Sequence, residues 1–187
     1  IRDASTSCGL GDVYKRQDFA GSAAVHTMGG IAALASAIVL GPRLGKYNKN
    51  GSSNIIPGHN LPLAATGGFI LWFGWFGFNP GSTLAAVGNW ELIGVVVVNT
   101  FLASAGGGIS AMIYTYFSYG KIDITMVING ILAGLVAITA GCNVVDPLSA
   151  IIIGLFAGVL VDLGVIYIDK LKICLLYTSP SPRDVEE

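Results

Sequence analysis

The chain has 187 residues, of which 53% are hydrophobic and only 11% are charged, and its mean hydropathy is +0.69. A soluble domain carries roughly 25% charged residues because its surface must face water, so this composition argues against a water-soluble fold and favours a membrane protein. The net charge of −1 predicts no nucleic-acid partner.

The three cysteines do not form a disulfide framework or a metal-ligand pattern. Cys8 and Cys174 lie near the two ends, and Cys142 stands alone in the hydrophobic body between Gly141 and Asn143. A lone cysteine in such surroundings is typical of a small packing residue. We therefore expect no cofactor and no bound metal.

The two ends of the chain are related to each other as DNA. When residues 174–184 are back-translated and read on the opposite strand, one base out of frame, the DNA encodes residues 7–17 with a single residue changed. Folding gives no reason for such a relation, and the DNA resembles a transposon-type sequencing adapter. We therefore expect 1–17 and 174–187 to be foreign and 18–173 to be the genuine segment. The alternative is a basic arm and a Pro/Ser-rich tail.

Five segments have the apolar character of a membrane span, which needs about 20 mostly apolar residues. In chain order they cover about 18–40, 61–79, 91–119, 124–140 and 147–168. The predicted fold class is therefore all-α, a polytopic transmembrane helix bundle. Glycines four residues apart, at Gly130 with Gly134 and at Gly154 with Gly158, let membrane helices approach closely. Glycine is also simply tolerated in such helices.

The basic residues of the segment 18–173 fall on alternate loops. Arg43, Lys46 and Lys49 follow the first span, Lys121 follows the third, Lys170 and Lys172 follow the fifth, and the other two loops have no Lys or Arg. Because Lys and Arg are enriched in cytoplasmic loops, we expect a multi-pass protein of the cell membrane. The 41–60 loop and the 169–173 end would be cytoplasmic, and Asp18 would lie at the outer face.

The first predicted span opens with Asp18 and places His26 eight residues later, about 12 Å along the helix and inside the bilayer. An ionisable group in a membrane is costly and indicates function by default, and a neutral imidazole offers one donor and one acceptor to a small polar molecule. His26 could instead be a core histidine bonded to a carbonyl group. Asp18 could simply cap the helix N-terminus.

The second predicted span ends in an aromatic segment, Gly-Trp-Phe-Gly-Phe-Asn-Pro-Gly-Ser at 74–82. Aromatic faces attract cations by about 0.5–2 kcal/mol, and a hydroxyl such as that of Ser82 can accept a bond from a cationic N–H group. Pro80 and Gly81 should end the helix and free carbonyl groups at the outer mouth. The spacing alone also fits an ordinary aromatic belt at a membrane interface.

Taken together, these motifs resemble the ammonium transporter (Amt/MEP/Rh) family. The resemblance rests on Asp-Phe-Ala-Gly at 18–21, on Val25-His26, on the aromatic segment at 74–82 and on Val98-Asn99-Thr100, in the same order as in the family. The family has an eleven-helix membrane fold and forms homotrimers with one pore per subunit. The resemblance places this sequence at about the fifth through ninth helices and implies a channel for ammonium or ammonia in nitrogen uptake, not an enzyme.

Carried over by position, His26 matches the first of two pore histidines, Trp75 a tryptophan that lines the pore wall, and Phe78 a phenylalanine that gates the outer mouth. Ser82 matches a hydroxyl of the outer ammonium site, and Asp18 an acidic residue near that site. The second pore histidine and the other gate phenylalanine belong to helices outside this sequence. The resemblance therefore implies that this chain alone cannot build a complete pore.

The mechanism that the resemblance implies is selection by desolvation, because burial disfavours the charged form of ammonium and hydrated metal cations find no compensating ligands. The expected partners are ammonium or ammonia, the lipid bilayer, the other subunits of a homotrimer and a cytoplasmic regulatory protein. Two alternatives stay open: an ammonium sensor that signals through a cytoplasmic extension, and a fragment without activity.

Overall fold

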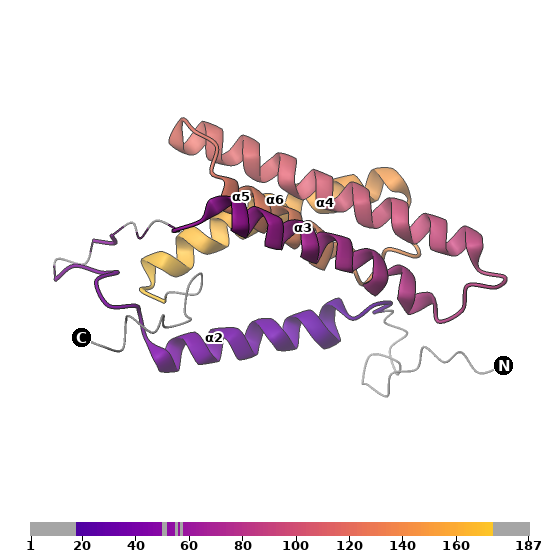
Figure 1. Cartoon of the computed structure of the whole chain (residues 1–187), viewed down its shortest axis with the longest axis horizontal. Coiled ribbons are helices and arrows are strands. Elements are labelled where there is room, and N and C mark those ends of the chain that lie inside the picture. The colour runs from indigo at the N-terminus through magenta and orange to yellow at the C-terminus, as the bar shows by residue number, and fades with distance from the viewer. Residues whose placement is uncertain (1–17, 50–51, 55, 57, 174–187) are drawn as a thin grey trace.

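The structure is a computed structural model that describes residues 18–49, 52–54, 56 and 58–173, so the predicted foreign ends lie outside the described residues. Its elements are the π-helical turn η1 (Ser22–Thr27), α2 (Met28–Leu40), α3 (Leu61–Phe78), the 3₁₀ turn η2 (Pro80–Thr83), α4 (Trp90–Tyr119), α5 (Ile124–Ile138) and α6 (Pro147–Lys170) (Figure 1). The strand-type pairing in this described part is one isolated bridge. The predicted all-α class is confirmed.

Four of these helical stretches are long and apolar enough to cross a membrane: Ser22–Leu40, Leu61–Thr83, Trp90–Tyr119 and Pro147–Lys170. The remaining predicted span, α5, is an apolar helix of only 15 residues, shorter than a full crossing requires. It ends at Ile138, and the chain then continues in turns up to α6. The first span also differs from its prediction, because its helix begins at Ser22 and not at Asp18.

Polar side chains and one glycine set the helix ends. The side-chain oxygens of Asn60, Asp123 and Asp146 accept hydrogen bonds from backbone N–H groups in the first turns of α3, α5 and α6. These N–H groups have no partner within their own helix. At the other end of α4, Gly120 adopts the left-handed φ of 68° that glycine reaches without strain.

The core of the described chain lies where α5 and α6 pack against α4. A Cβ atom added at Gly130 or Gly134 of α5 would overlap the backbone of α4, and so would one added at Gly154 or Gly158 of α6. Glycine is therefore the residue that permits these contacts. The prediction that the two glycine pairs mark close helix approach is confirmed, and mere tolerance of glycine does not explain them.

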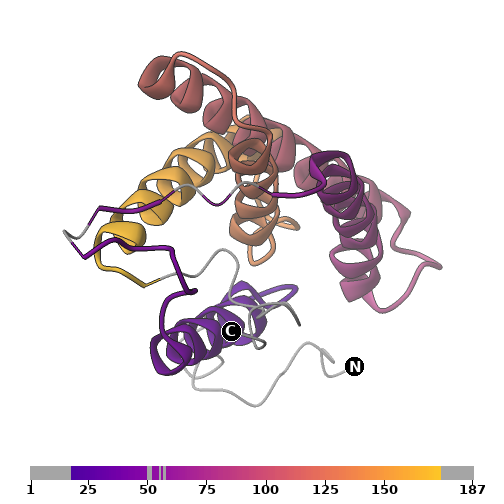
Figure 2. The same ribbon diagram turned by 60° about the vertical axis from the view of Figure 1, so that its left-hand side comes forward.

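Helix α2 lies apart from the other helices in both views of the chain (Figures 1 and 2). Among its residues only Ala37 is buried. It is attached at its two ends: the turn η1 leads into it from the segment that contacts α5, and the 41–60 loop leads out of it toward α6. These two attachments determine where the side chains carried by η1 and α2 can lie.

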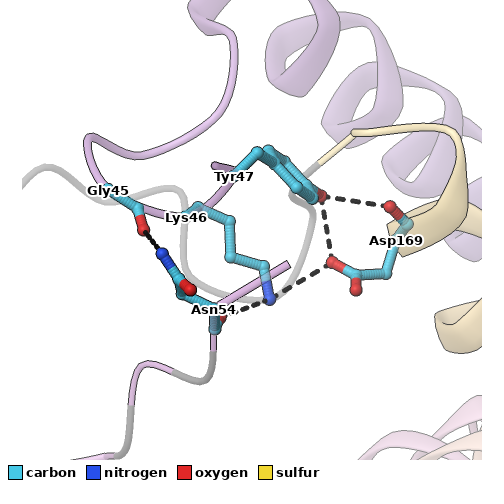
Figure 3. Close-up of polar contacts among 5 residues, drawn as sticks. All are labelled: Gly45, Lys46, Tyr47, Asn54 and Asp169. Carbon is cyan, nitrogen blue, oxygen red and sulfur yellow. Dashed lines mark hydrogen bonds and ion pairs between the residues drawn. The ribbon is translucent and has the colours of Figure 1, made fainter. Parts of the chain in front are cut away.

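The 41–60 loop is anchored to the C-terminal end of α6 by polar contacts (Figure 3). The Tyr47 hydroxyl donates to the Asp169 carboxylate at 2.9 Å, and Lys46 Nζ lies 3.2 Å from the same carboxylate. Within the loop, the side-chain amide of Asn54 donates to a backbone carbonyl at 2.8 Å. The loop and the C-terminal end of α6 therefore lie side by side, and the side of the membrane that they face stays a prediction.

Candidate functional site

Three of the five predicted site residues, His26, Trp75 and Phe78, meet in one place, which we call the aromatic cluster. The imidazole of His26 stacks on the indole of Trp75 with ring centroids 5.1 Å apart and planes at 21°. The Phe78 ring lies 5.6 Å from the imidazole and 5.9 Å from the indole. The cluster therefore joins η1 to the end of α3, two elements separated in the sequence by α2 and the 41–60 loop.

The turn η1 places His26, and Asp18 holds the start of that turn. The Asp18 carboxylate accepts hydrogen bonds from the backbone N–H groups of Ala23 and Ala24, at 3.1 and 2.9 Å. Gly21 precedes the turn with a left-handed φ of 98°, a conformation that favours glycine. The helix-capping role considered for Asp18 is thus confirmed, and the left-handed residue explains why the helix begins later than predicted.

One nitrogen of the His26 imidazole is left without a hydrogen-bond partner in the described chain. Nε2 is buried and has no hydrogen-bond partner among the residues that the structure describes. A buried nitrogen without a partner costs free energy, so the alternative of a core histidine bonded to a carbonyl group receives no support at this atom. A neutral imidazole can offer Nε2 as a donor or as an acceptor, according to its tautomer.

The indole of Trp75 is held by a residue that sequence reasoning missed. Its N–H group donates to Oγ1 of Thr139 at 3.1 Å. Thr139 follows α5, is fully buried, and donates its own hydroxyl to the Leu135 carbonyl at 2.6 Å. Nothing in the spacing of the sequence relates Thr139 to Trp75, because the contact exists only when α5 packs beside α3.

Ser82 lies half-buried in η2, one turn beyond the aromatic cluster. Its hydroxyl donates to the Phe78 carbonyl at 2.9 Å, and the Thr83 hydroxyl donates to the Pro80 carbonyl at 2.8 Å. The helix therefore does change at Pro80, but these two carbonyl groups are occupied and not free as expected. Since the proton of Ser82 is already used, its oxygen lone pairs are what it can offer to a cationic N–H group.

A buried polar network holds α3 and the turn after α5 against α4. The side-chain amide of Asn79 donates to Oγ1 of Thr100 at 3.1 Å. The side-chain amide of Asn99 donates to the carbonyl groups of Cys142 and Val145 at 2.9 and 2.8 Å. The motif that contains Asn99 and Thr100 therefore has a structural role: it fixes the end of α3 that carries the aromatic cluster.

Cys142 belongs to the apolar core together with residues of α4, α5 and α6, so its predicted role as a packing residue is confirmed. Burial raises the pKa of its thiol to about 12, which keeps the sulfur protonated and unreactive. Within the described ranges, no group of three or more His, Cys, Asp or Glu residues lies close enough together to hold a metal ion.

Comparison with known proteins shows which family this chain resembles. Residues 6–174 match the family model described as Ammonium Transporter Family. The ammonium transporter Amt2 of Archaeoglobus fulgidus is 51% identical over 162 residues, which are 86% of this chain and 34% of that protein. Ammonium transporter 1 member 1 of Arabidopsis thaliana is 42% identical over 172 residues, 87% of this chain and 34% of that protein.

Solved structures show the same similarity. A structure described as a sensor Amt protein is 51% identical, has a TM-score of 0.80 and is matched over 84% of this chain and 38% of that one. The structure of Mep2 from Candida albicans is 30% identical, with a TM-score of 0.71 over 87% of this chain and 36% of that one. The chain thus spans roughly a third of the length of these relatives.

Proposed function

The chain belongs to the ammonium transporter family, and we propose that it is part of a protein that passes ammonium or ammonia through a narrow hydrophobic pore. The observation that carries this proposal is the aromatic cluster. It combines a buried imidazole nitrogen without a partner, two aromatic rings in contact with that imidazole, and a position within helices long enough to span a membrane.

The chemistry of the aromatic cluster suits a small cation that can lose its proton. An ammonium ion that approaches Phe78 and Trp75 gains the attraction between a cation and an aromatic face, which strengthens as water is removed. Desolvation at the same time disfavours the charged form. Where the ion gives its proton to water at the outer end, the neutral ammonia that results can exchange hydrogen bonds with Nε2 of His26. A metal cation such as potassium cannot become neutral by losing a proton, and it would find too few ligands there to replace its hydration shell.

The residues at the outer end would act before this step. We propose that the oxygen of Ser82 accepts a hydrogen bond from the arriving ammonium. Asp18 contributes through its negative charge and by capping η1, and so it helps to orient His26. This division of roles follows the hydrogen bonds that the two side chains already make, because both oxygens of Asp18 face η1 while the lone pairs of Ser82 remain available.

Further parts of the proposal concern the whole protein. We propose a homotrimer in the cell membrane, with the 41–60 loop and the 169–173 end in the cytoplasm, where a regulatory protein can bind. The second pore histidine and the remaining gate residues would come from helices beyond this chain. We also propose that residues 1–17 and 174–187 are adapter-derived. Sequencing the source locus tests this directly, and finding these segments encoded in the genome would contradict it.

The second candidate function is ammonium sensing. It is favoured by the solved structure described as a sensor Amt protein, which is as identical to this chain as the Archaeoglobus fulgidus transporter is. A sensor would bind ammonium through the same cluster but would pass the signal to an attached cytoplasmic domain. The locus sequence separates the two: a further helix with a second histidine favours transport, and an appended signalling domain favours sensing.

Uptake by the full-length protein tests the proposed function. The protein is produced in cells that lack their own ammonium uptake, and growth on low ammonium and the accumulation of labelled methylammonium are measured. We expect both to be restored. A protein that reaches the membrane in normal amount but restores neither would contradict transport and would leave sensing as the better proposal.

A further inference from the structure

The aromatic cluster has two parts: the segment that carries His26, and the end of α3 that carries Trp75 and Phe78. Both parts are attached to the C-terminal end of α5. The last carbonyl groups of a helix have few partners within it and accept bonds from elsewhere. Here the carbonyl groups of Val136, Thr139 and Ala140 accept hydrogen bonds of 2.6, 3.2 and 3.1 Å from the Ser22 hydroxyl and from two backbone N–H groups of the 18–21 segment. The segment that leads to His26 is therefore fixed to α5.

The end of α3 that carries Trp75 is attached to the end of α5 through the side chain of Thr139. The Thr139 hydroxyl donates its proton to the Leu135 carbonyl at 2.6 Å, so a lone pair of the same oxygen is left to accept the indole N–H of Trp75 at 3.1 Å. An indole N–H in the apolar interior of a membrane protein needs an acceptor. Thr139 is fully buried, and so this acceptor is held in one orientation.

We propose that Thr139 is a positioning residue for transport: its hydroxyl sets the plane of the Trp75 indole against the imidazole of His26. The stack at 5.1 Å and 21° then depends on a residue outside the three rings of the cluster. If the Thr139 hydroxyl is lost, the Trp75 indole turns so that its N–H group reaches another hydrogen-bond acceptor. The spacing of the rings and the access to Nε2 of His26 change with it. This inference rests on the proposed function for its effect on uptake.

Thr139 could act through its hydrogen bond to Trp75 or only through the packing of its side chain. Two substitutions separate these roles because the roles predict opposite results. Thr139→Val keeps the size and branching of the side chain but removes the acceptor. Thr139→Ser keeps the acceptor but removes the methyl group. If the hydrogen bond matters, Thr139→Val is impaired and Thr139→Ser is not; if packing matters, the order is reversed. Thr115→Val is the matched control, because Thr115 is also fully buried and its hydroxyl donates within α4, to the Ala111 carbonyl at 2.9 Å.

The experiment measures methylammonium uptake by the full-length protein, normalised to its abundance in the membrane. We expect Thr139→Val to lower the rate about tenfold, which corresponds to about 1.36 kcal/mol and is near the upper end of the net contribution of one hydrogen bond. Thr139→Ser and Thr115→Val should stay within about twofold of wild type. In a Trp75→Phe background, which lacks the indole N–H, Thr139→Val should cause no further loss.

Three results would overturn the inference: normal uptake with Thr139→Val, equal losses with Thr139→Val and Thr139→Ser, or an additional loss in the Trp75→Phe background. Thr139→Ala repeats the test if Thr139→Val does not reach the membrane. The ultraviolet resonance Raman signal of the indole N–H adds a readout that does not need uptake. If wild-type protein shows no uptake, the proposed function fails. The inference that Thr139 positions Trp75 still stands if Thr139→Val, but not Thr139→Ser or Thr115→Val, weakens the hydrogen bond that the Trp75 indole N–H donates. It falls if Thr139→Val leaves that hydrogen bond unchanged.

Discussion

Replacing Gly154 of α6 by alanine is expected to destabilise the fold. A Cβ atom at this position would overlap the carbonyl oxygen of Ala103 in α4 and would also lie within 2.8 Å of its Cα atom. These are backbone atoms, which cannot rotate away as a side chain can. Gly134 of α5 meets the same carbonyl from another helix, so α4 cannot move aside without losing that contact. Overpacking of a tight interior costs about 1–3 kcal/mol, and we expect a loss in the upper half of this range.

The assay is unfolding of the full-length protein in detergent, followed by the loss of helical signal with heat or with added sodium dodecyl sulfate. Gly164→Ala is the control in the same helix, because an added Cβ there meets nothing within 4 Å in the described chain. It should change the unfolding free energy by no more than about 0.5 kcal/mol. If Gly154→Ala were as stable as wild type, or if both variants lost the same stability, the close packing of α6 against α4 would be refuted.

Further predictions concern the loop anchor, the outer end and the buried thiol. Tyr47→Phe should speed protease cleavage of its loop about fivefold, because one hydrogen bond to a carboxylate is lost, whereas Lys49→Gln should not; equal rates would contradict the anchor. Ser82→Ala should raise the methylammonium concentration needed for half-maximal uptake, and an unchanged value would remove Ser82 from recruitment. Burial raises the pKa of the Cys142 thiol to about 12, so almost none of it is thiolate at pH 8 in the folded protein, and maleimide should label it at that pH only after unfolding. Rapid labelling of the folded protein would contradict this burial.

Much of the fold could be predicted from the sequence because membrane spans are defined by their own composition. The predicted second span, 61–79, differs from α3 by one residue. The fourth predicted span, 124–140, runs two residues beyond the end of α5 at Ile138, because composition does not reveal that the chain turns there. The start of the first span was placed too early, since a left-handed Gly21 cannot be distinguished in the sequence from a helical one.

The candidate site could be predicted only in part. Spacing placed His26 inside the bilayer but left the aromatic segment open as an interfacial belt, and the resemblance to a family was needed to bring His26, Trp75 and Phe78 together. The structure shows that the three rings meet, while their role in transport stays a prediction. Thr139 could not be predicted, because its bond to Trp75 depends on how α5 packs beside α3.

The central claim, that the imidazole of His26 takes part in passage, is tested most directly by measuring methylammonium and potassium uptake side by side. His26→Ala in the full-length protein should lose uptake of methylammonium, because the narrow apolar passage no longer offers a hydrogen bond at that point. His26→Glu should keep conduction but admit potassium, since a fixed negative charge stabilises dehydrated metal ions. If both variants reach the membrane normally and show the rate and selectivity of wild type, His26 is a packing residue and the account of the pore is wrong.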